Sequence, residues 1–82
     1  MRGSIAVAPS AKDGPFDVMF YPDGKDGAVP KYTAKDFAEL ERALASFRIK
    51  LTEEQVEKLE TDGINIPDVN APDEILKEYG LV

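Results

Sequence analysis

The apolar residues of this chain repeat with two different periods, and this change constrains the fold more than any other feature. Phe16, Val18 and Phe20 alternate with other residues, as on one face of a β-strand. Further on, apolar residues recur at the spacing that forms one stripe of an α-helix: Phe37, Leu40, Leu44 and Phe47. The sequence therefore predicts an α+β fold, with strands first and helices after them.

Proline and glycine clusters divide the chain into three parts of a single small domain, residues 1–82. Residues 1–15 are predicted to form a flexible arm or an edge strand. Residues 16–32 are predicted to form a β-hairpin whose turn spans residues 22–27, and residues 33–82 a region of three helices. The expected architecture is a small antiparallel β-hairpin, or a three-stranded sheet, packed against about three α-helices.

Residue types that favour helix starts place these three helices. The first is predicted to begin at Thr33, with Asp36 completing a capping box. The second begins at Thr52, with Gln55 at the reciprocal capping position. The third follows Asn70, a capping residue before an early proline and acidic first-turn residues.

Two glycines give the expected helix ends. Gly63 ends the second helix and Gly80 the third, each by adopting a positive φ. Within the second helix, Val56 and Leu59 are expected to face inward. The proline-containing segment 65–71 is predicted to be a connector between the second and third helices.

The chain length and the lack of cysteine limit how this protein can be stabilised. Eighty-two residues bury only about 60–65% of their unfolded surface, so the core is modest. The chain has no cysteine and therefore no disulfide, and a cytoplasmic location is the expectation. No apolar run approaches the ~20 residues of a membrane span, and the N-terminal apolar stretch is too short for a signal peptide.

The absence of histidine and cysteine removes most catalytic mechanisms. A hydrolytic triad and a thiol nucleophile are both impossible, and no glycine-rich phosphate loop occurs. Residues 23–27 superficially resemble a calcium loop, but Lys25 and Gly27 stand where an EF-hand needs oxygen ligands. We therefore predict a protein that is not an enzyme, without catalytic, cofactor-binding or metal-binding residues. Two carboxylates meeting in a cleft are the remaining route to catalysis.

Acidic residues are concentrated at one end of the chain. Residues 52–82 hold nine acidic and two basic side chains, whereas residues 1–51 hold seven acidic and eight basic ones. This balance argues against direct binding to nucleic acid or anionic membranes, where neutralisation of phosphate by Lys and Arg supplies most of the affinity. It favours a partner with a basic surface.

The first candidate for such contact is one side of the second helix. Glu53, Glu57 and Glu60 are four and three residues apart, which places them along one side of that helix, with Asp62 just beyond. The alternative interpretation is a surface that only solubilises the protein.

The second candidate is a face of the predicted hairpin. Met19 and Tyr21 lie on the strand face opposite Phe16, and they form an apolar interface if helices cover only one face of the sheet. The alternative is that the N-terminal arm around Ile5 and Val7 covers them.

These observations favour a non-enzymatic protein-interaction module, which would act as an inhibitor, an adaptor or an accessory subunit through its acidic helical face. One alternative is an inhibitor that imitates nucleic-acid phosphate and blocks a DNA- or RNA-binding protein. Another is a homo-oligomeric structural protein that associates through the hairpin edge or the Met19 and Tyr21 face.

Overall fold

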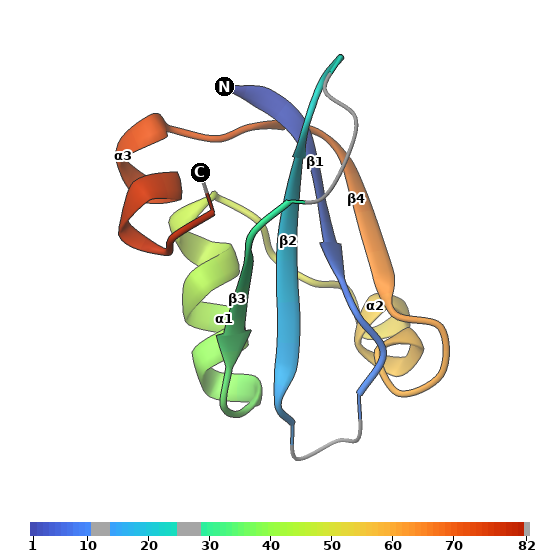
Figure 1. Ribbon diagram of the computed structural model, residues 1–82. Coiled ribbons are helices and arrows are strands. Elements are labelled where there is room, and N and C mark those ends of the chain that lie inside the picture. Colours follow the sequence, from blue (N-terminus) through green and yellow to red (C-terminus); the bar gives the residue numbers. More distant parts are fainter. Residues whose placement is uncertain (11–13, 25–28, 82) are drawn as a thin grey trace.

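A computed structural model of the chain describes residues 1–10, 14–24 and 29–81 and confirms a small α+β domain (Figure 1). The part of the predicted turn that falls on residues 25–27 lies outside these ranges. The elements in chain order are β1 (Arg2–Val7), β2 (Phe16–Pro22), β3 (Lys31–Ala34), α1 (Phe37–Ser46), α2 (Glu53–Lys58), β4 (Ile64–Asn70) and α3 (Asp73–Glu78).

The four strands form one antiparallel sheet in the order β3-β2-β1-β4. The expected hairpin of β2 and β3 is present, but the prediction that residues 1–15 form an arm or an edge strand is wrong. Residues 2–7 form β1, an inner strand, in which Ile5 pairs with Phe20 on one side and with Ile66 on the other. Ile5 and Val7 fit there because both are fully shielded on the helix side of the sheet.

The fourth strand corrects the prediction that residues 65–71 are a connector. Pro67 suggested a break because it cannot donate a ladder hydrogen bond, but β4 is an edge strand and contains a bulge, where proline is tolerated. Gly3 pairs with Val69 and Ile5 with Ile66, so two residues of β4 lie opposite one residue of β1. Asp68 completes the bulge with a φ of 58°.

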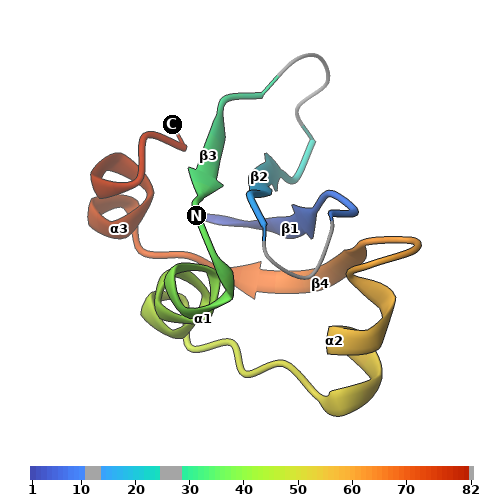
Figure 2. The same cartoon turned by 90° about the horizontal axis from the view of Figure 1, so that it is seen from below.

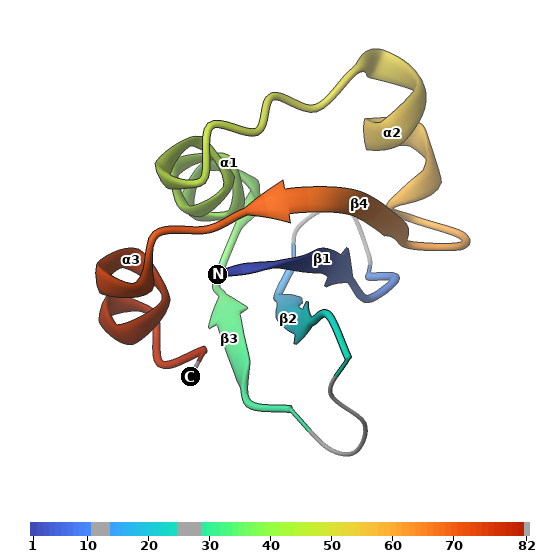
Figure 3. The ribbon, with the colours of Figure 1, turned by 90° about the horizontal axis from the view of Figure 1, so that it is seen from above.

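Helices cover one face of this sheet. Figures 2 and 3 show α1 and α3 on the same side, while α2 lies beside β4. Between sheet and helices lies one core of buried apolar side chains, to which all strands and the α1 and α3 helices contribute. No helix of the described ranges is long and apolar enough to cross a membrane.

The α1 helix confirms the predicted stripe but not the predicted start. Leu40, Leu44 and Phe47 are buried, and Phe37 is half-buried. Thr33 belongs to β3, because the pairing with β2 continues as far as Ala34, opposite Phe16. The N-cap is Asp36, whose carboxylate accepts a 2.9 Å hydrogen bond from the Glu39 N–H.

The α2 helix confirms the capping box and corrects its inward face. Thr52 Oγ1 accepts from the Gln55 N–H at 3.2 Å, and Gln55 Oε1 accepts from the Thr52 N–H at 2.9 Å. The helix ends at Lys58 and not, as predicted, at Gly63, so it is only six residues long and contains no buried residue; Gly63 does adopt the expected positive φ of 73°. Leu59, directly after it, reaches the core as predicted, whereas Val56 is 36% exposed instead of buried.

The N-cap of the α3 helix lies two residues later than predicted. Asn70 is the last residue of β4, and the N-cap is Pro72, which makes no side-chain capping bond. The predicted end at Gly80 is confirmed: Gly80 has a φ of 69° and donates to the Lys77 carbonyl at 3.1 Å. Leu81 then donates to the Leu76 carbonyl at 2.8 Å, which completes a Schellman motif.

Candidate protein-interaction surface

The acidic side of α2 is displayed to solvent as the sequence predicted. Glu53 and Glu57 are exposed on the helix itself, and Glu60 and Asp62 are exposed in the turns that follow it. Glu60 was expected within the helix, but the helical path continues only through turns, in which the Asp62 N–H donates to the Lys58 carbonyl at 2.9 Å. None of these four carboxylates forms an ion pair with another residue of the described ranges.

Val56 supplies an apolar centre to this surface. It lies three residues after Glu53 and four before Glu60, which places it on the same side of the helical path. With 36% of its surface exposed, it is among the few large apolar side chains that face solvent in the described part of the chain. We call the set Glu53, Val56, Glu57, Glu60 and Asp62 the acidic helical face.

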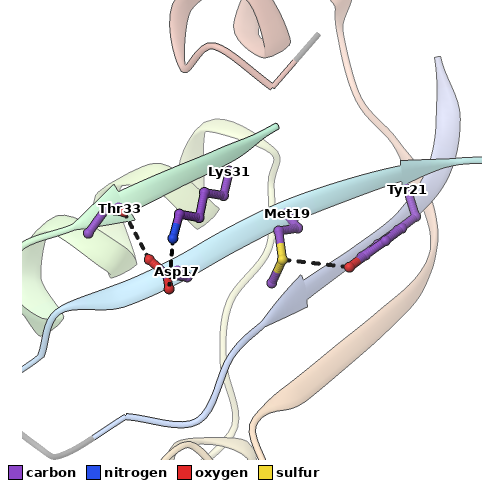
Figure 4. A network of polar contacts seen from close by, with 5 residues as sticks. All are labelled: Asp17, Met19, Tyr21, Lys31 and Thr33. Atoms are coloured by element: carbon purple, nitrogen blue, oxygen red, sulfur yellow. Dashed lines mark hydrogen bonds and ion pairs between the residues drawn. The ribbon is translucent and has the colours of Figure 1, made fainter. Parts of the chain in front are cut away.

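The second predicted surface, around Met19 and Tyr21, is also open. Both side chains lie on the sheet face opposite α1 and α3, where Met19 is half-buried and Tyr21 is 39% exposed. The Tyr21 hydroxyl donates to Met19 Sδ at 3.6 Å (Figure 4). The alternative that the arm around Ile5 and Val7 covers this face is wrong, because both residues point into the core from within the sheet.

Polar side chains share this open sheet face and make it less apolar than predicted. Asp17 accepts a 2.9 Å hydrogen bond from Thr33 Oγ1 and lies 3.7 Å from Lys31 Nζ (Figure 4). These contacts join β2 to the edge strand β3. The open face and the acidic helical face lie on different sides of the sheet, so the structure does not unite the two predicted surfaces into one site.

A third feature has no counterpart in the sequence predictions. A groove of about 440 Å³ lies between α1 and the segment that follows it. Its apolar lining comes from Leu44, Ala45, Ile49 and Leu51, and its polar lining from Glu41, Arg42 and Lys50. The groove depends on a reversal of the chain at Arg48, which adopts a φ of 61°, so that the Ile49 N–H donates to the Leu44 carbonyl at 2.9 Å.

An aromatic cluster joins β3, α1 and α3 and contains Tyr32, a tyrosine whose pKa is raised. The Tyr32 and Tyr79 rings pack edge to face with centroids 4.8 Å apart, and the Tyr79 hydroxyl shares a 3.1 Å hydrogen bond with Ser46 Oγ. The Tyr32 hydroxyl donates a short hydrogen bond to Glu39 Oε1. This bond, together with burial and the negative charge of Glu39, raises the pKa of Tyr32 to about 12.

This raised pKa predicts a loss of stability in alkaline solution. The unfolded chain releases the Tyr32 proton near its ordinary pKa of 10.0, whereas the folded protein holds it to about pH 12. The stabilisation is therefore complete below pH 10 and is lost as the pH rises towards 12. We expect urea unfolding to show that the stability difference between the wild type and Tyr32→Phe shrinks over this interval. A difference that stays constant with pH would contradict the prediction.

The described residues contain no group of three or more acidic side chains placed to hold a metal ion. Comparison of the chain with models of protein families, with curated proteins and with solved structures found no match.

Proposed function

We propose that this protein is a non-enzymatic interaction module, an inhibitor, adaptor or accessory subunit, that binds a basic protein surface through its acidic helical face. One observation carries the proposal: α2 buries none of its own residues, and it presents Val56 among carboxylates that no described cation neutralises. A cytoplasmic partner is part of the proposal, because a chain without cysteine gains nothing from an oxidising compartment.

Electrostatics supports a basic partner. Exposed carboxyl groups are ionised at neutral pH, and like charges three or four residues apart on a helix cost a few tenths of a kcal/mol per pair. Glu53 and Glu57 have this spacing. A partner rich in Lys and Arg would offset this repulsion and would be steered towards the acidic end of the molecule.

The position of Val56 supports a protein partner over a merely solubilising surface. Protein interfaces commonly place an apolar contact inside a polar and charged rim, and the acidic helical face has this layout. Its small size predicts a contact that depends on few residues.

Charge reversal on α2 tests the proposal. The Glu53→Lys/Glu57→Lys variant is expected to fold with a stability within about 0.5 kcal/mol of the wild type, because both side chains are exposed. In affinity capture and cross-linking from the native host, this variant should lose a basic protein that the wild type retains at low salt. Isolated wild-type protein and partner should then associate more weakly as salt increases.

A matched control is available on α3. Glu74→Lys/Glu78→Lys makes the same change of charge at two exposed positions of another helix and should keep the partner. Equal retention by both double variants would refute the role of α2. Competition between this protein and DNA or RNA for the isolated partner would instead support the alternative of nucleic-acid mimicry.

A further inference from the structure

The groove and the acidic helical face are formed by consecutive segments of the chain. Leu51 ends the groove lining, and α2 begins at Glu53. Figure 2 shows α1, the segment after it and α2 following one another along one side of β4. The lining of the apolar groove therefore ends directly before Thr52, the N-cap of the helix that carries the exposed Val56.

The charges of these two neighbours are opposite. Arg42 and Lys50 are exposed at the groove and outnumber its one acidic residue, Glu41, whereas α2 presents Glu53 and Glu57. Within the described ranges, none of these residues forms an ion pair in the monomer. In the monomer, the basic side chains at the groove and the acidic side chains of α2 are thus both available to pair with charges on another molecule.

A second copy of the chain supplies the complement to both halves at once. Rotation about a two-fold axis between the groove and α2 exchanges the two, because a two-fold interface brings patch i of one copy against patch j of the other and the reverse. Each Val56 then faces the other copy's groove, and each pair of α2 carboxylates faces Arg42 and Lys50. We propose that the protein forms a two-fold dimer in which α2 of each copy docks against the groove of its partner.

Charge complementarity favours this occupant over an unrelated protein. An unrelated partner would need an acidic, apolar patch opposite the groove and a basic patch opposite α2, side by side. This chain itself presents both patches in the required order. Pairing would also add buried apolar surface to a domain whose length allows only a modest core. The surface differs from the hairpin edge and from the Met19 and Tyr21 face.

The dimer rests on the proposed function only in using the same acidic helical face. A basic partner and a second copy would therefore compete, so that self-association would cover the acidic helical face until the partner displaces the second copy. The dimer is measured on the protein alone, which keeps the two ideas separable. A monomer that still captures its partner through α2 removes only the dimer, and a dimer that captures no basic partner removes only the proposed function.

Sedimentation equilibrium from micromolar to millimolar protein concentration is the direct test. The average mass is expected to rise from the 9.0 kDa of the monomer towards twice that value. A wild-type protein that remains monomeric at millimolar concentration overturns the inference.

Charge reversals then test the orientation of the pairing. Arg42→Glu/Lys50→Glu makes the whole surface acidic, and Glu53→Lys/Glu57→Lys makes it basic in both halves. Each variant alone should raise the dimer dissociation constant by more than about tenfold, because like charges then face each other. Mixed together, the two variants should form a heterodimer, since every reversed charge meets its opposite.

Matched controls separate this effect from that of net charge. Lys35→Glu/Lys77→Glu and Glu74→Lys/Glu78→Lys change the net charge equally at exposed positions elsewhere and should dimerise like the wild type. Circular dichroism confirms that each variant is folded. Reversals that leave the dimer unaffected, or folded variants that fail to associate when mixed, overturn the inference.

Discussion

Replacing Leu44 by alanine is expected to lower the free energy of unfolding by roughly 2–5 kcal/mol. The side chain is 1% exposed and belongs to the core that joins α1 to the sheet. Its truncation removes buried methyl groups and leaves a cavity that the surrounding strands can fill only in part. Small domains have a net stability of about 5–15 kcal/mol, so this single change could remove much of it.

Urea or thermal unfolding followed by circular dichroism measures this loss. Val56→Ala is the control, because it also shortens an aliphatic side chain but at a position that is 36% exposed. It should cost less than about 1 kcal/mol. Equal effects of the two substitutions would mean that α1 does not pack on the sheet through Leu44.

Gly63→Ala is the second substitution with a large expected effect. Gly63 has a φ of 73°, where an alanine costs about 1–2 kcal/mol. A Cβ atom at this position would also lie 2.5 Å from the Val7 carbonyl oxygen and 3.0 Å from Pro9. The backbone must therefore shift where β1 ends and β4 begins, so we expect a total loss of roughly 2 kcal/mol or more.

Gly80→Ala separates the two causes of this loss. Gly80 has a similar φ of 69°, but a Cβ atom added there meets no other atom within 4 Å. It should lose only the conformational cost of about 1–2 kcal/mol, and less than Gly63→Ala. Unfolding of the two variants under the same conditions gives the contribution of the steric contact as their difference. If Gly63→Ala proves no more harmful than Gly80→Ala, the close approach of Gly63 to β1 is wrong.

Local features of the sequence predicted local features of the structure well. The stripe of Leu40, Leu44 and Phe47, the capping box of Thr52 and Gln55 and the helix end at Gly80 each depend on residues within about one to three turns of helix. Their physical causes, side-chain periodicity and hydrogen bonds at helix ends, act over the same short range.

The strands were predicted less well because their partners are distant in sequence. β1 became an inner strand only because β4, some sixty residues further along the chain, pairs with its second edge. β4 itself was missed because Pro67 suggested a break in the strand. The local sequence does not reveal that this segment lies at the edge of the sheet, where proline is tolerated. In the same way, the pairing of β3 with β2 keeps Thr33 in a strand, although its local sequence resembles a helix start.

The candidate surfaces show the same difference between features that depend on local sequence and features that depend on the tertiary structure. The exposed acids of α2 could be predicted because charged side chains are seldom buried. The exposure of Val56 could not, since it results from how short α2 is and from its lack of any buried residue. The groove beside Arg42 and Lys50 exists only because the chain reverses after α1.

The sequence by itself therefore determined the α+β class, the covered face of α1, the start of α2 at Thr52, the end of α3 at Gly80 and the acidic character of residues 52–82. These properties follow from composition and from interactions between residues close together in the chain. Only the tertiary structure decided the strand order, the open sheet face and the placement of an apolar groove beside an acidic helix. Those depend on contacts between distant segments, which are selected by the burial of a shared core and leave no periodic signal in any one segment.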